Sequence, residues 1–75
     1  MSQVEVLKMS GVRPARRCWV VVGGRHEDEV LVIEMGDVYA VGTVLDDWYV
    51  APAQAVKGLL AKLLKVKEED ILLSC

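Results

Sequence analysis

The chain has 75 residues, of which 53 % are hydrophobic, and a formal net charge of −2. This length predicts one small domain over residues 1–75, and the negative charge argues against a generic nucleic-acid binder. No apolar run approaches the roughly 18–20 residues of a membrane-spanning helix, and no signal peptide is evident. We therefore expect a cytoplasmic protein with no membrane partner. The absence of Asn and the abundance of Val are typical of thermophilic sources.

Four β-strands are predicted in the first part of the chain, because β-branched and apolar residues cluster between Gly- and Pro-containing turn signals. They cover residues 3–9, 17–23, 29–35 and 38–44, separated by a loop at 10–16, a polar turn at 24–28 and a tight turn at 36–37. The last three form an antiparallel meander. Its first two strands are nearly continuous apolar runs, which indicates central strands. Gly42 is interpreted as a bulge or a close backbone approach.

One helix is predicted after a connector at residues 45–51. Pro52 suits the first helical turn because its φ is fixed. Apolar residues then recur at helical spacing and form one stripe: Val56, Leu59, Leu60, Leu63 and Leu64. A turn at 67–70 and a short strand at 71–75 close the chain.

The predicted fold class is therefore α+β: a four-stranded, mostly antiparallel sheet in the order β-β-β-β-α-β, with one amphipathic helix packed on one face and a short C-terminal strand. The two apolar strands indicate that the second face is also covered. A single helix cannot cover both faces, so the cover would come from curvature of the sheet or from another subunit.

Charge is distributed unevenly. Residues 1–26 carry five basic residues and one acid, residues 27–56 carry seven acids and no base, and residues 57–75 carry four Lys and three acids. This pattern favours charge pairing within the chain or head-to-tail contact between copies.

The best candidate for an anion site is the basic group Arg13, Arg16 and Arg17, with Trp19 as a stacking aromatic. Arg25 and His26 follow at the opposite end of the same predicted strand, so we do not expect them to join it. A solvated basic loop explains the same residues. Trp48 and Tyr49 follow two aspartates, which would repel a phosphate backbone.

No pattern in the chain predicts an enzyme, a cofactor or a metal site. Residues 26–29 are metal-ligand types, but adjacent residues in one turn rarely reach one ion, and there is no second His and no Cys-x-x-Cys. Gly23-Gly24 joins two strands and lacks the Lys-Ser/Thr of a phosphate loop. No nucleophile–base pair is evident.

Cys18 and Cys75 are the two cysteines, and both fall at predicted strand ends. If the closing strand lies beside residues 17–23, they could form a disulfide that closes a long loop; two free thiols are the alternative.

The surplus of aliphatic residues over one helix leads to the hypothesis of a small non-enzymatic protein-interaction domain. Its expected partner is another protein or a second copy, bound through an apolar sheet face or edge. The alternative is an anion- or nucleic-acid-binding module that uses Arg13, Arg16 and Arg17.

Overall fold

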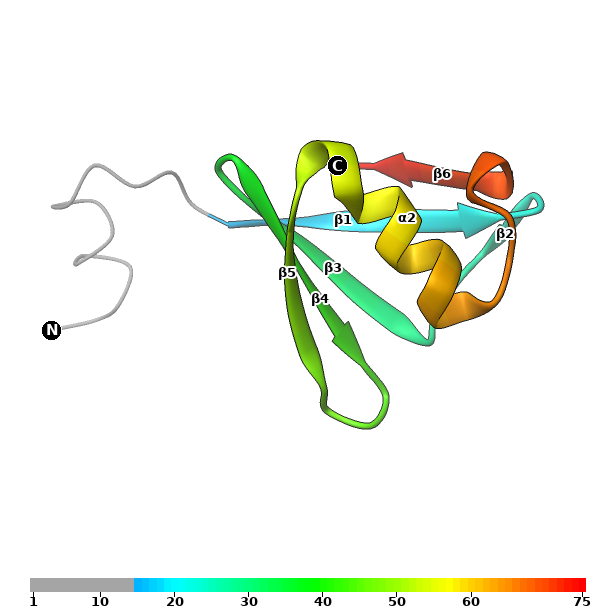
Figure 1. The fold of residues 1–75 in the computed structure, drawn as a ribbon, viewed down its shortest axis with the longest axis horizontal. Coiled ribbons are helices and arrows are strands. Elements are labelled where there is room, and N and C mark those ends of the chain that lie inside the picture. The colour runs from blue at the N-terminus through cyan, green and yellow to red at the C-terminus, as the bar shows by residue number, and fades with distance from the viewer. Residues whose placement is uncertain (1–14) are drawn as a thin grey trace, which may run out of the picture.

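The fold is described from a computed structural model, in which residues 15–75 are placed. One antiparallel sheet and one main helix make up this part of the chain (Figure 1). The elements in chain order are β1 (Arg16–Val22), β2 (Arg25–His26), β3 (Val30–Met35), β4 (Val38–Thr43), β5 (Trp48–Pro52), α2 (Ala53–Leu64), the 3₁₀ helix η1 (Glu68–Asp70) and β6 (Ile71–Ser74).

Strand β1 organises the sheet, because it has neighbours on both edges. Its first half pairs with β3 and its end pairs with β2, while β6 pairs antiparallel along residues 19–22. Beyond β3 the sheet continues to β4 and then β5, also antiparallel. The predicted meander is thus confirmed. The closing strand lies beside β1, which is the condition that the possible disulfide required.

Each hairpin has the turn chemistry that its length requires. Gly23 and Gly24 both take positive φ, as a two-residue type I′ turn needs, and Gly36 alone does so in the next turn, as in type II′. Between β4 and β5, the backbone carbonyl of Thr43 accepts a hydrogen bond from the Asp46 amide, and the Thr43 amide donates one to the Asp47 carbonyl. Asp46 has φ 64°, so this is a three-residue loop that ends in a left-handed residue.

Helix α2 crosses one face of the sheet (Figure 1). Pro52 is its N-cap residue, and Lys65 ends it in the left-handed conformation, with the Val66 amide donating to the Ala61 carbonyl. Of the predicted stripe, Val56 and Leu60 are buried and the three remaining leucines are half-buried. The helix therefore packs on the sheet with the predicted side.

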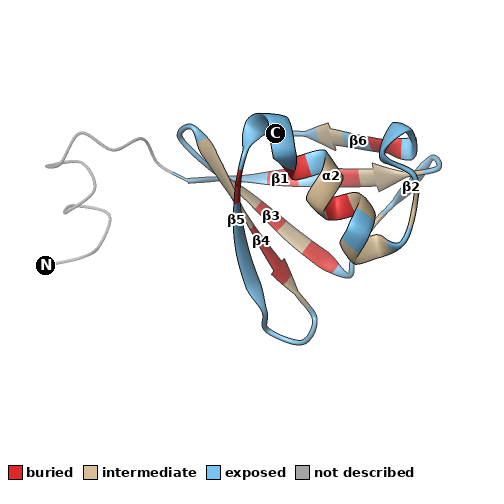
Figure 2. Ribbon diagram, in the orientation of Figure 1, coloured by how far each residue is buried: buried red, intermediate tan, exposed pale blue. Residues whose placement is uncertain are grey.

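The buried core lies between α2 and the sheet, and Figure 2 shows it as red segments on the facing elements. Its nine members are Cys18, Val20, Val30, Val32, Val41, Ala51, Val56, Leu60 and Ile71. All are apolar or a cysteine, so the covered face of the sheet holds no buried charge among residues 15–75.

Three sequence predictions need correction. The connector at 45–51 is wrong, because β5 occupies Trp48–Pro52 and the sheet has more strands than predicted. The polar turn at 24–28 contains the short strand β2. Gly42 lies in regular pairing with Leu31 and Trp48, so it is not a bulge. The strand predicted at 3–9 and most of the loop at 10–16 lie outside the described residues.

Candidate protein-interaction surface

Both faces of the sheet are largely apolar, but α2 packs on only one of them. Side chains alternate across a strand, so the register assigns each residue to one face. The face toward α2, here called the inner face, includes Val20 and Val32. The outer face carries the alternate residues of the strands: Arg17, Trp19, Val21, His26, Leu31, Ile33, Met35, Val38, Ala40, Gly42, Trp48, Val50, Pro52, Leu72 and Ser74.

Large hydrophobic side chains of the outer face are exposed to solvent. Trp19 and Trp48 are each 52 % exposed, Val50 is 71 % exposed and Leu72 is 64 % exposed. Figure 2 shows the exposed class along most of β5. These side chains, with half-exposed Met35, present on the order of 500 Å² of mostly apolar surface, which is comparable to the largest, often functional, apolar patches of monomeric proteins.

Gly42 allows the Trp48 indole to lie close to the sheet on this face. The two residues are paired across β4 and β5, and the indole lies over the glycine. A Cβ atom at Gly42 would come within 2.7 Å of the Trp48 ring atom Cη2. The group that lies close to Gly42 is therefore the Trp48 side chain. The sequence correctly indicated a close approach at Gly42 but attributed it to backbone.

Arg17, Trp19 and His26 form a polar–aromatic group at the β1 side of the outer face. The Arg17 guanidinium carbon lies 4.4 Å from the centre of the Trp19 ring, which is a cation–π geometry. His26 packs edge-on against the same ring at 6.3 Å. Trp19 is thus a surface residue, held in place by two neighbours.

A shallow hollow of about 170 Å³ lies beside Arg17. Leu31, Gly42 and Trp48 line it together with the carboxylate residues Asp28 and Glu29. The hollow therefore combines an apolar floor with one cation and two acids.

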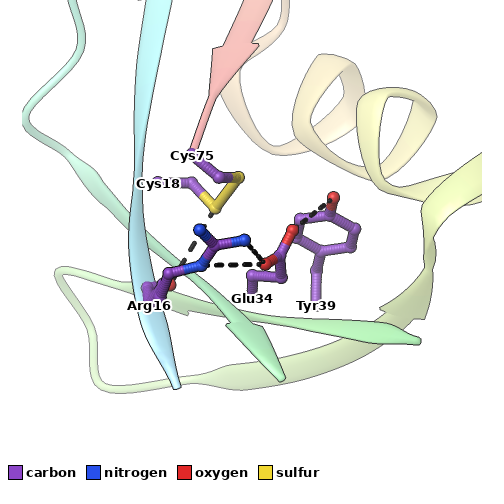
Figure 3. Close-up of polar contacts among 5 residues, drawn as sticks. All are labelled: Arg16, Cys18, Glu34, Tyr39 and Cys75. Atoms are coloured by element: carbon purple, nitrogen blue, oxygen red, sulfur yellow. Dashed lines mark hydrogen bonds and ion pairs between the residues drawn. A yellow bond between two sulfur atoms is a disulfide. The ribbon is translucent and has the colours of Figure 1, made fainter. Parts of the chain in front are cut away.

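The predicted anion group is divided by the structure. Arg16 faces inward and donates to Glu34 Oε1 at 2.7 Å, and Tyr39 donates to the other Glu34 oxygen at 3.4 Å (Figure 3). Arg17 points to the opposite face, and Arg13 lies outside the described residues. Arg25 pairs with Val22 at the far end of β1, as expected. The described arginines do not form one cluster.

Cys18 and Cys75 are joined by a disulfide in the structure, with Cα atoms 4.0 Å apart (Figure 3). The register explains why they meet. The Gly23 amide donates to the Asp70 carbonyl, and alternation along this ladder makes positions 18 and 75 a non-hydrogen-bonded pair, where Cα atoms are closest. The bond ties the end of β6 to β1.

Among residues 15–75, His, Cys, Asp and Glu side chains do not gather into a group of three or more that could hold a metal ion. In the same part of the chain, helices are too short or too polar to cross a lipid bilayer.

Two residues of this surface, Trp48 and Val50, were missed as strand residues. The adjacent aspartates and the short length made residues 45–51 resemble a connector. The available signal was the alternation in β5, where Trp48 and Val50 face outward while Tyr49 and Ala51 face the helix side.

Comparison of the chain with protein-family models, with curated proteins and with solved structures finds no match. The surface is therefore interpreted from its own residues and geometry.

Proposed function

We propose that this chain is a small non-enzymatic protein-interaction domain that self-associates through its outer face. The observation that carries the proposal is the composition of that face. Its strand residues include two Trp, one Met and one Arg, but neither Lys nor any acid. The acids Asp28 and Glu29 lie at its border, beside the hollow next to Arg17. Enrichment in aromatic residues, Met and Arg with depletion of Lys and acids distinguishes the core of protein interfaces from other surfaces.

The exposed area supports a partner of protein size. A standard interface buries about 800 Å² on each partner. The five exposed large hydrophobic side chains of the outer face supply on the order of 500 Å² of this, and half-buried residues such as Ile33 and Val38 add to it.

A second copy suits the face because the face is complementary to itself. In a two-fold dimer each patch meets the same patch of its partner. Apolar rows can pack against apolar rows, and Arg17 of one copy can approach the hollow bordered by Asp28 and Glu29 of the other. A net charge of −2 opposes such association only weakly.

The face is a better candidate than the sheet edges. Strand β5 is short and ends in Pro52, which has no amide hydrogen to donate, and β6 has only four residues. Both features reduce edge-to-edge pairing.

Sedimentation velocity across a concentration series tests the proposal. The wild-type chain is expected to shift from monomer to dimer, whereas Val50→Asp combined with Leu72→Asp is expected to stay monomeric, because two desolvated charges would oppose burial. Both positions are exposed, so the fold should tolerate the changes. Gln54→Asp is the control. It adds a charge at an exposed position of α2, away from the outer face, and this variant should dimerise normally. A wild-type chain that stays monomeric at high concentration contradicts the proposal.

A further inference from the structure

Strand β6 forms one border of the outer face. Leu72, which is 64 % exposed on that face, pairs with Val21 of β1, and Ser74 pairs with Trp19. Among residues 15–75, β6 pairs with β1 and with no other strand, and Figure 1 shows it beside β1 at the edge of the sheet. The position of this border therefore depends on what fastens β6 to β1.

The two ends of β6 are fastened in different ways. Its first residue, Ile71, is 1 % exposed and anchors the start of the strand in the core, and Leu73 adds a half-buried contact. Beyond Ser74, the disulfide joins Cys75 to Cys18 of β1 (Figure 3). A four-residue strand with one neighbour makes few hydrogen bonds, so such a segment opens locally at low cost. The disulfide is therefore the main anchor of the end of β6.

The two cysteines differ in exposure. Cys18 is 3 % exposed and belongs to the buried core, whereas Cys75 is exposed. A reductant therefore reaches the bond from the Cys75 side. Exposed disulfides are more readily reduced by thiols than buried structural ones.

We propose that the Cys18–Cys75 disulfide regulates self-association through the outer face, so that its reduction weakens the dimer. This inference rests on the proposed function. In the oxidised chain, β6 is fixed at both ends and presents Leu72 beside Val21. In the reduced chain, the end of β6 is free to separate from β1. Its separation withdraws part of the apolar border and leaves one edge of β1 without a partner strand.

The reductant is a dithiol, and the reaction is a thiol–disulfide exchange. One thiolate of the dithiol attacks Cys75 Sγ, and the electron pair of the broken sulfur–sulfur bond leaves on Cys18 Sγ, which takes up a proton. The second thiolate attacks the reductant's own sulfur atom in the mixed disulfide and releases Cys75 Sγ, which also takes up a proton. The dithiol thereby loses two electrons and two protons and becomes a disulfide, while the protein gains two thiols.

Reduction leaves the main contacts of the core in place. The thiol of Cys18 behaves as a small apolar group and suits a buried site. Val32, Val41 and Leu60 are fully buried between the sheet and α2, and none of them belongs to β6. The structural change is therefore confined to β6 and its border with β1.

Sedimentation velocity of the full chain, with and without dithiothreitol, tests the proposal, and non-reducing intact mass identifies the form present. The reduced chain should need about tenfold higher concentration than the oxidised chain to reach the same fraction of dimer. Cys75→Ser, which cannot form the bond, is the matched control. It should associate as weakly as the reduced wild type and should not respond to dithiothreitol.

Hydrogen exchange read by mass spectrometry shows where reduction acts. Residues 71–74 and their partners 19–22 should exchange faster after reduction, whereas residues 30–43 should keep their protection. Exchange that rises equally in all these segments overturns the proposal, because the disulfide would then stabilise the whole domain instead of one border.

Failure of this proposal can be told from failure of self-association. Oxidised and reduced chains that dimerise equally overturn the regulation and leave self-association in place. An oxidised chain that stays monomeric at high concentration contradicts self-association, and the regulation falls with it. Because coupling is reciprocal, the dimer should also protect the bond. A reduced fraction that does not fall with rising protein concentration, at fixed dithiothreitol, therefore contradicts the regulation as well.

Discussion

The inner and outer faces of the sheet come from the same strands and have similar hydrophobicity, yet only the inner face is buried. Val32 and Val41 are fully buried beneath α2, whereas Val50 and Leu72 remain mostly exposed on the other side. The difference lies in the cover: the described residues supply one helix for two apolar faces. An apolar strand pattern thus predicts that both faces of a sheet require burial. Whether both are buried within the monomer depends on how many helices the chain has to pack on them.

The largest expected effect on stability comes from removing the Cys18–Cys75 disulfide, which ties β6 to β1. Replacing Cys75 by Ser should lower the free energy of unfolding by about 4 kcal/mol in the chain-entropy account, because Cys18 and Cys75 are 57 residues apart. Urea unfolding measures the loss. Non-reducing intact mass provides the prior check, and a mass equal to two free thiols removes the basis of this prediction.

A matched pair of leucines compares the faces directly. Leu60→Ala should cost about 3 kcal/mol, because it leaves a cavity at a fully buried site. Leu72→Ala, at a 64 % exposed site, should cost less than about 1 kcal/mol but weaken dimerisation. Urea unfolding and sedimentation of both variants measure the contrast. Equal losses of stability would mean that the outer face is packed within the monomer.

Gly42→Ala should alter the outer face without adding charge. The new methyl group would collide with the Trp48 indole, and the ring must move because the backbone is held in regular pairing. We expect a loss of about 1 kcal/mol and a change in tryptophan fluorescence. Ala40→Gly, a small-residue exchange at the adjacent outer position of β4, is the comparison, and an unchanged emission spectrum in Gly42→Ala would contradict the described contact.

The smallest expected effect is a gain in stability from a substitution at the C-terminal end of α2, the helix that covers the inner face. Lys65 takes a left-handed conformation at the end of α2, which glycine adopts at lower cost. Lys65→Gly should therefore raise the free energy of unfolding by about 0.5–1 kcal/mol, without changing dimerisation. Lys62→Gly, within the helix, should lower it by about 1 kcal/mol. A loss at both positions would show that the cap is not left-handed.

Local signals account for what the sequence predicted correctly. Paired glycines and continuous Val runs identified β1, β3 and β4, and the leucine spacing identified α2. Long-range geometry was harder to predict. Nothing local shows that the Trp48 ring covers Gly42, or that Arg16 and Arg17 face opposite sides of the sheet. The meeting of Cys18 with Cys75 required the closing strand to be placed first.

The pairing of β6 with β1 also has a consequence for the order of folding. Trp19 and Ser74 are partners, so the strand at one end of the described sequence is completed by residues at the other. During synthesis, β1 and the hairpins that follow it can form early, but one edge of β1 stays unsatisfied until residues 71–74 have emerged. Contacts of such long sequence separation slow folding, so the β1–β6 pairing should form later than the hairpins that follow β1.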